Sequence, residues 1–197
     1  MNDLTRTIYN TGTIINFKPA FEMLNDELAK IGQFLEVVCV GGYVMQLHGF
    51  RGTMDIDAFY KSNTALDNAI RRVGDKLSIN QPDEAWLNNS VANTNPAPSS
   101  AHIETVHQFS NLSVMKIDIL YLMGMKLYSG RKQDLRDVAT ILVRDNNKQP
   151  LELLAKLENI SFKLDISVVL DAYEEAYGMD WLKQFYIENE AMLEKLY

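Results

Sequence analysis

The sequence is poor in the residues that hold disulfide-rich and zinc-binding proteins together. Its 197 residues include one cysteine and three histidines. Because a single thiol cannot form an internal disulfide, the chain is not a disulfide scaffold. Cys39 lies in an apolar run, where a small core residue is the simplest interpretation. His102 and His107 lack the close spacing of structural zinc ligands, so zinc is set aside.

Long apolar runs and an excess of basic residues are also missing. No stretch approaches the ~18 consecutive apolar residues that cross a bilayer, and the first residues lack the charged-then-apolar order of a secretion signal. We therefore expect a cytoplasmic protein without a membrane segment. The formal net charge is −7, with 11 acids against 5 bases after position 144. Since general nucleic-acid binders carry a basic stripe, the composition argues against that class.

Apolar residues recur at helical spacing in two segments, 17–31 and 64–77, and each is predicted to form an amphipathic helix. Residues 34–40 form a continuous apolar run rich in β-branched side chains, which is typical of a buried strand. Pro82 favours the start of a short helix that reaches Leu87. The other elements predicted for this part are a helix over 42–49, a strand over 55–60, and a hairpin of strands over 102–109 and 112–115.

From residue 117 onward the pattern changes to helices alone. The predicted helices cover residues 117–129, 133–145, 150–159, 164–177 and 181–196. The change predicts two parts, an α/β core over residues 1–116 and a helical region over residues 117–197. The predicted fold class is α+β, with a small mixed sheet flanked by helices and followed by a C-terminal helical region.

The most informative segment joins a strand end to two acids. Gly41 and Gly42 follow the first predicted strand, and Asp55 and Asp57 lie one residue apart in the next. Alternation along a strand puts the two carboxylates on one face, where they repel each other unless a cation lies between them. The pair therefore predicts a divalent-metal site. Because glycines at a strand end let the backbone approach a phosphate, the segment indicates nucleotide chemistry.

A diglycine followed after twelve residues by Asp-x-Asp resembles the signature of the DNA polymerase β-type nucleotidyltransferase superfamily. The intervening His48-Gly49 and Thr53 make the segment similar to the bacterial branch that includes the AbiEii-type toxin nucleotidyltransferases. A second segment resembles another element of that branch, Met-Lys-Leu followed by Arg-x-x-Asp-x-x-Asp. Its residues here are Met125, Lys126 and Leu127, then Arg131, Asp134 and Asp137. The resemblance implies a nucleotidyltransferase fold.

The same resemblance implies Mg²⁺-assisted transfer of a nucleotide from a nucleoside triphosphate. Asp55 and Asp57 would bind the metal and act in catalysis, and Lys126 would contact the triphosphate. Asp134 is assigned to the catalytic site by the same matching, and Asp137 shares its helix face. A local cluster of salt bridges is the structural alternative for these two acids.

Four further residues are predicted to bind the nucleotide. Gly41 and Gly42 would lie against a phosphate, although a tight strand-to-helix turn also explains two glycines at this place. Arg51 and Thr53 precede the carboxylate pair, where a phosphate contact and plain solvation of a loop are equal alternatives.

Sites of this superfamily usually draw a third carboxylate from a neighbouring strand. The candidates are Glu104, in a predicted strand, and Asp118, at the mouth of a predicted helix, where an acid also serves as a cap. Because neither matches the pattern cleanly, a second hypothesis stays open. It is a catalytically degenerate relative that keeps the fold and has a regulatory or partner-binding role.

The residues do not specify the acceptor of the nucleotide. Kinship with toxin nucleotidyltransferases suggests a tRNA end or a protein hydroxyl as acceptor and an antitoxin as partner. An enzyme of the antibiotic-modifying kind, acting on a small molecule, is the other catalytic alternative, and association with a second copy of the chain is a further partner hypothesis.

Overall fold

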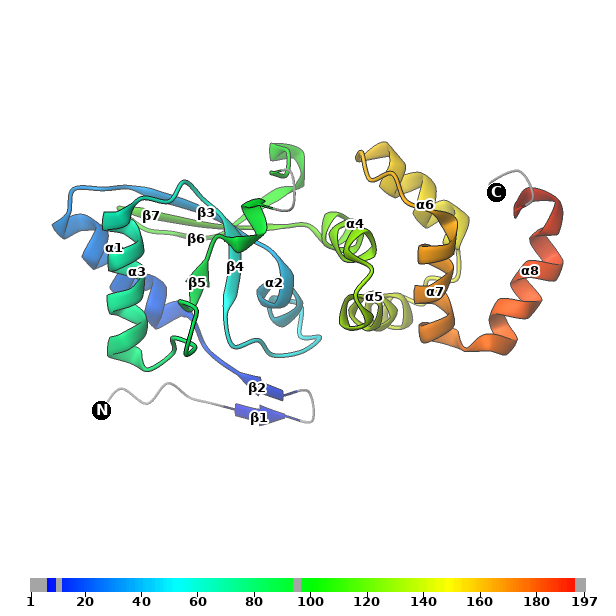
Figure 1. Cartoon of the computed structure of the whole chain (residues 1–197), viewed down its shortest axis with the longest axis horizontal. Helices are drawn as coiled ribbons and strands as arrows, with labels where there is room; N and C mark the ends of the chain where they lie inside the picture. Colours follow the sequence, from blue (N-terminus) through cyan, green and yellow to red (C-terminus); the bar gives the residue numbers. More distant parts are fainter. Residues whose placement is uncertain (1–6, 10–11, 94–96, 194–197) are drawn as a thin grey trace. The chain divides into compact units, whose positions relative to one another are not determined.

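The chain divides into two compact units, residues 1–119 and 120–197, and each is described here by itself (Figure 1). The computed structural model describes residues 7–9, 12–93 and 97–193. A small hairpin of β1 (Thr7–Tyr9) and β2 (Gly12–Ile14) comes first in the chain.

A five-stranded mixed sheet forms the first unit. Its strands are β3 (Leu35–Cys39), β4 (Ile56–Phe59), β5 (Leu87–Asn88), β6 (Ile103–Gln108) and β7 (Leu112–Ile117), in the order β5-β4-β3-β7-β6. β3 is parallel to β7 and antiparallel to β4, β5 is parallel to β4, and β6 and β7 form an antiparallel hairpin. The predicted mixed sheet, its central strand and its hairpin are confirmed.

Helices α1 (Lys18–Lys30) and α3 (Thr64–Leu77) lie side by side on one face of the sheet (Figure 1). Every second residue of β3 points into this core, because side chains alternate along a strand. Val37 and Cys39 are fully buried there with Ile56 and Ala58 of β4. Asp57 lies between Ile56 and Ala58, so it faces away from the layer of α1 and α3.

The short helix predicted to begin at Pro82 is wrong. Residues 82–84 form bends, and the chain then enters β5, the outermost strand beside β4. Trp86 explains the difference, because its fully buried ring packs 5.5 Å from the Phe21 ring and its indole N–H donates to the Ile70 carbonyl at 2.9 Å. The buried indole holds this segment extended beside β4.

The second unit is helical, as the sequence predicts. Its helices are α4 (Ile119–Ser129), α5 (Lys132–Arg144), α6 (Pro150–Asn159), α7 (Ile166–Tyr177) and α8 (Met179–Leu193). Val169, Ala172 and Tyr173 are buried on α7 and belong to the core of this unit. Within the described residues, no helix has the length and apolar character to span a membrane.

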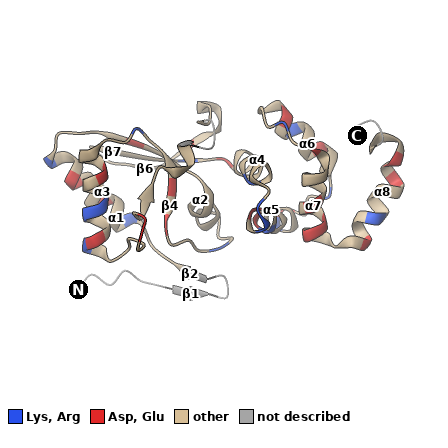
Figure 2. Ribbon diagram, in the orientation of Figure 1, with Lys and Arg blue, Asp and Glu red and all other residues tan. Residues whose placement is uncertain are grey.

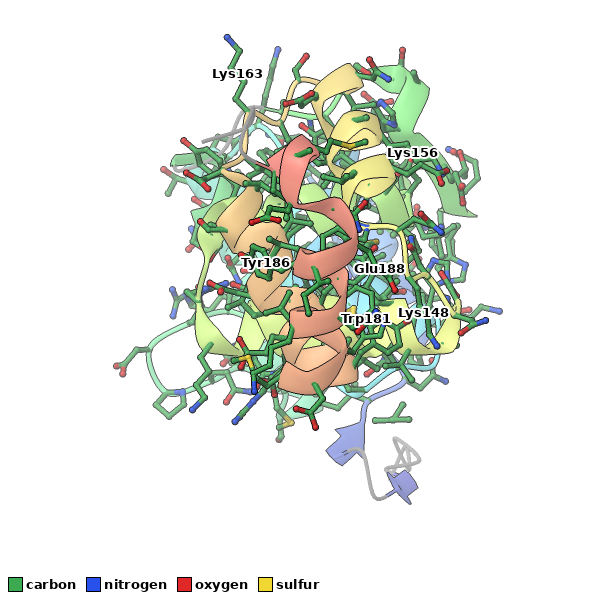
Figure 3. All side chains as sticks on the ribbon, turned by 90° about the vertical axis from the view of Figure 1, so that its right-hand side faces the viewer. Lys148, Lys156, Lys163, Trp181, Tyr186 and Glu188 are labelled. Carbon is green, nitrogen blue, oxygen red and sulfur yellow. The ribbon has the colours of Figure 1, made fainter. Side chains whose placement is uncertain are left out.

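Helix α8 carries an aromatic column and many charges. The Trp181 ring stacks on Tyr173 of α7 and on Phe185, with ring centroids 5.5 Å apart in both pairs. Figure 3 looks onto this helix, with Trp181, Tyr186 and Glu188 labelled along it. Acidic residues recur along α7 and α8 (Figure 2), in agreement with the acidic balance of the sequence after position 144.

Candidate functional site

One edge of the sheet gathers most of the residues that the sequence singles out. β3 and β7 are parallel, so both end at this edge, and β4 begins there because it runs antiparallel to β3 (Figure 1). The residues at the edge are Gly41 and Gly42 after β3, Asp118 after β7, Asp55 just before β4, and Asp57 within β4.

Gly41 and Asp57 are direct neighbours. The backbone of Gly41 has φ +58°, in the left-handed region that favours glycine. A Cβ atom built on Gly41 would lie 3.1 Å from Oδ2 of Asp57. The backbone N–H of Val40 also donates to the Asp57 carbonyl at 2.9 Å. The diglycine turn and the second acid of the pair therefore face the same space.

Gly42 is linked to Asp55 through Thr53. A Cβ atom on Gly42 would lie 2.5 Å from the Thr53 hydroxyl oxygen and 3.4 Å from Nη1 of Arg51. The Thr53 hydroxyl donates to Oδ1 of Asp55 at 3.1 Å, and its backbone N–H donates to Oε1 of Gln46 at 3.1 Å. Buried Thr53 thus fixes the loop that carries Asp55 against the start of α2 (Gly41–Leu47).

The structure adds an acid that sequence reasoning missed. Burial raises the pKa of Glu84, and the negative charges of Asp55 and Asp57 raise this pKa further. Glu84 lies in the segment before β5, which is parallel to β4 and so enters the sheet at the same edge. No sequence signal points to Glu84, because a helix predicted to begin at Pro82 does not place this residue beside Asp55 and Asp57.

Asn88 and Ser90 were also missed, and both lie beside Asp57. Asn88 is the residue of β5 paired with Asp57 of β4. The Ser90 hydroxyl lies 2.5 Å from Oδ1 of Asn88 and 3.5 Å from Oδ1 of Asp57. The side-chain nitrogen of Asn88 is buried and has no hydrogen-bond partner among the residues that the structure describes. An unpaired buried donor costs about 1–3 kcal/mol, and such groups call for an explanation.

The two acids proposed from sequence as third carboxylates have partners of their own. Oδ2 of Asp118 lies 2.8 Å from Nδ1 of His102. Glu104 is exposed and accepts a hydrogen bond from Nζ of Lys116 at 2.6 Å. Of these two acids, Asp118 follows a strand that ends beside the diglycine turn, whereas Glu104 is near the start of β6 at the outer side of the sheet.

Mg²⁺ suits a pair of carboxylates in this setting. The ion keeps several waters and is commonly held by one or two protein carboxylates together with substrate phosphates. Among the described residues, no three His, Cys, Asp or Glu side chains are grouped so as to hold a metal ion by themselves. The raised pKa of Glu84 beside Asp55 and Asp57 and the unpaired side-chain nitrogen of Asn88 are compatible with a cation bound at this end of the sheet.

In the second unit, Lys126 forms a buried ion-pair cluster. Its ammonium donates to Oδ1 of Asp134 at 2.8 Å and to Oδ2 of Asp137 at 2.6 Å. All three residues are at least 95% buried. Burial raises the pKa of Asp134, but hydrogen bonds from Lys126 and Arg131 outweigh it, so the pKa lies below its usual value. The cluster ties α4 to α5.

Cys39 is a core residue, as predicted. Its thiol is fully buried in β3, and burial raises its pKa, so the group stays protonated and is not a nucleophile.

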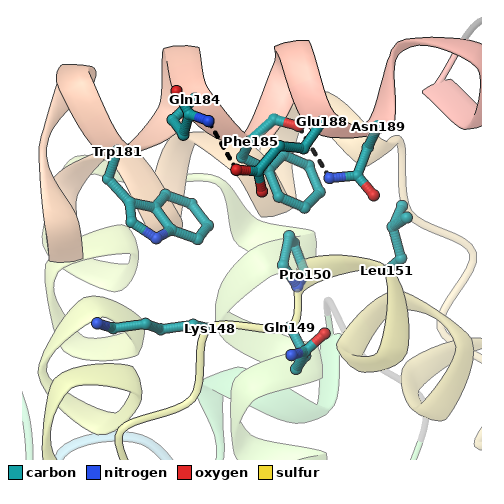
Figure 4. A pocket seen from close by; sticks show the side chains of 9 residues that line it. All are labelled: Lys148, Gln149, Pro150, Leu151, Trp181, Gln184, Phe185, Glu188 and Asn189. Carbon is teal, nitrogen blue, oxygen red and sulfur yellow. Dashed lines mark hydrogen bonds between the residues drawn. The ribbon is translucent and has the colours of Figure 1, made fainter.

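A groove of about 310 Å³ lies between the start of α6 and one face of α8 (Figure 4). Trp181 and Phe185 form its aromatic wall and Lys148 lies at its rim. Two of its polar side chains already have partners, because Gln184 donates to Glu188 at 2.6 Å and Asn189 donates to the Phe185 carbonyl at 2.9 Å. The groove lacks a carboxylate pair of the kind found beside the diglycine turn.

The fold and the acid pair at the diglycine turn define a protein of the nucleotidyltransferase class. A family model described as a nucleotidyltransferase of unknown function (DUF6036) matches residues 16–168, and the chain belongs to this family. The match includes every residue predicted for the site and ends within α7, before α8. No curated protein and no solved structure matches the chain.

Proposed function

We propose that this protein transfers a nucleotidyl group from a nucleoside triphosphate to a hydroxyl-bearing acceptor, with Mg²⁺ bound by Asp55 and Asp57. The observation that carries the proposal is the direct approach of Gly41 to the Asp57 carboxylate. The turn after β3 and the acid of β4 thereby face one space. Membership of a nucleotidyltransferase family supports the same reaction class.

The residues at this end of the sheet have separate proposed roles in binding the cation and the phosphates. Asp55 and Asp57 would hold the cation, and Thr53 orients Asp55 through its hydroxyl. Gly41 and Gly42 carry no side chains that would keep a phosphate from the backbone, and the Arg51 guanidinium beside Gly42 would supply positive charge. Bound Mg²⁺ would supply charge neutralisation for the triphosphate and a lowered pKa for the attacking hydroxyl.

Glu84 and Asp118 are the two candidates for a third carboxylate, although neither forms a metal-binding group of three acids with Asp55 and Asp57. Glu84 is close enough to the acid pair for its pKa to respond to both charges. Asp118 follows a strand that ends at the same sheet edge. A triphosphate contact by Lys126 and a catalytic role for Asp134 rest on the resemblance to the AbiEii-like branch alone, since both residues lie in the second unit.

For the acceptor, we propose a compact group rather than a long nucleic acid. The chain has no basic excess that would hold many phosphates, since it carries 26 acids against 19 bases. A tRNA end, a protein hydroxyl and a small molecule all satisfy this condition. The resemblance to the AbiEii-like branch supports a toxin role with an antitoxin partner as a further proposal. A cytoplasmic location is proposed as well.

A catalytically silent module is the second candidate. It is favoured by one observation, the lack of a three-acid metal cluster among the described residues. Such a protein would bind a nucleotide and release no pyrophosphate.

The deciding experiment incubates the whole protein with each of four labelled nucleoside triphosphates and Mg²⁺ or Mn²⁺, and measures pyrophosphate release and label transfer. Asp55→Asn and Asp57→Asn should abolish both signals. Asp83→Asn is the matched control, because Asp83 is an exposed acid just before β5. Triphosphate binding without pyrophosphate release would favour the silent module, and wild-type signals in Asp57→Asn would refute the assigned site.

A further inference from the structure

Asn88 has a side chain whose orientation is fixed by its neighbours. Its Oδ1 accepts from the Ser90 backbone N–H at 3.1 Å and lies 2.5 Å from the Ser90 hydroxyl. A backbone N–H can only donate, so the oxygen of the amide must face Ser90 and the nitrogen must face away. The assignment of the two amide atoms therefore follows from the hydrogen bonds.

The nitrogen end of this amide is the unusual part. Asn88 is 92% buried, and its Nδ2 has no hydrogen-bond partner among the residues that the structure describes. The next residue provides a contrast, because Asn89 has both ends satisfied by Tyr60. Its Nδ2 donates to the Tyr60 carbonyl at 2.8 Å, and its Oδ1 accepts from the Tyr60 N–H at 3.4 Å. The amide of Asn89 therefore has hydrogen bonds at both its oxygen and its nitrogen, whereas the amide of Asn88 has a nitrogen without a partner among the described residues.

The surroundings show which acceptor this donor can serve. Asn88 pairs with Asp57 across β5 and β4, so both side chains stand on the same face of the sheet. The Ser90 hydroxyl donates to Oδ1 of Asn88 at 2.5 Å and lies 3.5 Å from Oδ1 of Asp57. Since Nδ2 of Asn88 is closed off from solvent, a dissolved substrate cannot reach it directly, whereas the neighbouring carboxylate is part of the same sheet.

We propose that Asn88 is a positioning residue that acts through Asp57, with Ser90 fixing the orientation of the amide and the spare amide donor supporting the Asp57 carboxylate when a divalent cation is bound. Carboxylates that ligate metals are generally held by hydrogen bonds from a surrounding layer of residues, and loss of such a partner typically lowers metal affinity by about 10- to 100-fold. The inference rests on the proposed function of the same site.

The test measures Mn²⁺ binding to the full chain, by electron paramagnetic resonance and by calorimetry, together with urea unfolding of the metal-free protein. Asn88→Ala should weaken Mn²⁺ binding about 10- to 100-fold. Asn89→Ala is the matched control, since it removes two hydrogen bonds to Tyr60 and should reduce stability while it leaves Mn²⁺ affinity within about threefold of wild type.

A double-mutant cycle separates support of Asp57 from a general effect on the fold. Asn88→Ala and Ser90→Ala should be non-additive in their effect on Mn²⁺ affinity, because the Ser90 hydroxyl acts by holding the Asn88 amide in its orientation. Wild-type Mn²⁺ affinity in Asn88→Ala, or equal losses in the Asn88 and Asn89 variants, overturns the proposal while Asp57→Asn still tests the metal site. If wild-type protein binds no Mn²⁺, both the proposed function and this inference fall.

Discussion

Position 41 requires glycine for two reasons, the conformation of its backbone and the lack of space for a side chain. Its φ of +58° lies in the left-handed region, which costs other residues roughly 1–2 kcal/mol. A side chain there would also press on the Asp57 carboxylate, because even a Cβ atom would be 3.1 Å from Oδ2. The first reason concerns the turn and the second concerns the acid pair, so the two can be separated by mutation.

We predict that Gly41→Ala weakens divalent-cation binding in addition to straining the turn. The matched control is Gly49→Ala, because Gly49 has φ +75° and open space where a Cβ would lie. Both variants should lose about 1–2 kcal/mol of unfolding free energy, measured with urea. Only Gly41→Ala should also bind Mn²⁺ more weakly, by about tenfold or more, and equal affinities in the two variants would remove Gly41 from the site.

At the scale of the elements, one buried acid joins α1 to α3. Glu27 of α1 is 6% exposed. Its carboxylate accepts from Lys30 at 2.9 Å, from Lys76 of α3 at 3.1 Å, and from Arg72 of α3 at 3.3 Å. Hydrogen bonds from Lys30 and Lys76 lower the pKa of Glu27 from 4.5 to about 2. The ionised form of Glu27 is therefore favoured in the folded state.

This lowered pKa predicts how stability changes with pH. A carboxyl whose pKa is lower in the folded state contributes stability above its unfolded pKa, and the contribution is lost as the pH falls toward the folded pKa. Glu27→Gln should therefore cost about 2 kcal/mol at pH 7, and the difference from wild type should vanish between about pH 4.5 and pH 2. Urea unfolding at a series of pH values measures both quantities.

Glu22→Gln is the control on the same helix. Glu22 is exposed, and its contact with Lys18 spans 4.0 Å, so the substitution should change stability by less than about 0.5 kcal/mol at any pH. A pH-independent cost of Glu27→Gln would contradict the ion-pair explanation and point to packing instead.

Elements with strong periods were predictable from sequence, and the shortest strand was not. α1 and α3 carry apolar stripes that fix their type and position. β5 has two residues and owes its existence to pairing with β4, about thirty residues earlier in the chain. Local patterns do not contain such a pairing. Pro82 therefore predicts a helix start from sequence, whereas burial of Trp86 holds the segment extended in the structure.

The same reason explains which site residues could be predicted. Gly41, Gly42, Asp55 and Asp57 belong to one short segment, where spacing alone indicates their proximity. Residues brought to the acid pair by the β4–β5 pairing carry no local signal, and they are Glu84, Asn88 and Ser90. Among the helices, the sequence offered a salt-bridge cluster for Asp134 and Asp137, yet only coordinates identify Lys126 as the cation that joins them.

At the scale of the whole molecule, the family match spans the sheet unit and most of the helical unit. The acid pair lies in the first unit and the Lys126 cluster in the second. The burial of Lys126 leads to a prediction about the stability of the second unit. Removal of the ammonium takes away the cation that Asp134 and Asp137 share, while Arg131 still pairs with Asp134. Breaking a buried ion pair costs about 3–5 kcal/mol.

We predict that Lys126→Met lowers the unfolding free energy by about 3–5 kcal/mol, whereas Lys132→Met, at an exposed position, changes it by less than about 0.5 kcal/mol. Adding Asp137→Asn should restore part of the loss, because it removes one of the two buried negative charges that Lys126 balances. Triphosphate and Mn²⁺ binding by this more stable double variant then separates the two roles of Lys126. Normal Mn²⁺ affinity with weakened triphosphate binding would support a direct contact, full binding of both would leave Lys126 a structural role, and wild-type stability of Lys126→Met would contradict the ion-pair cluster.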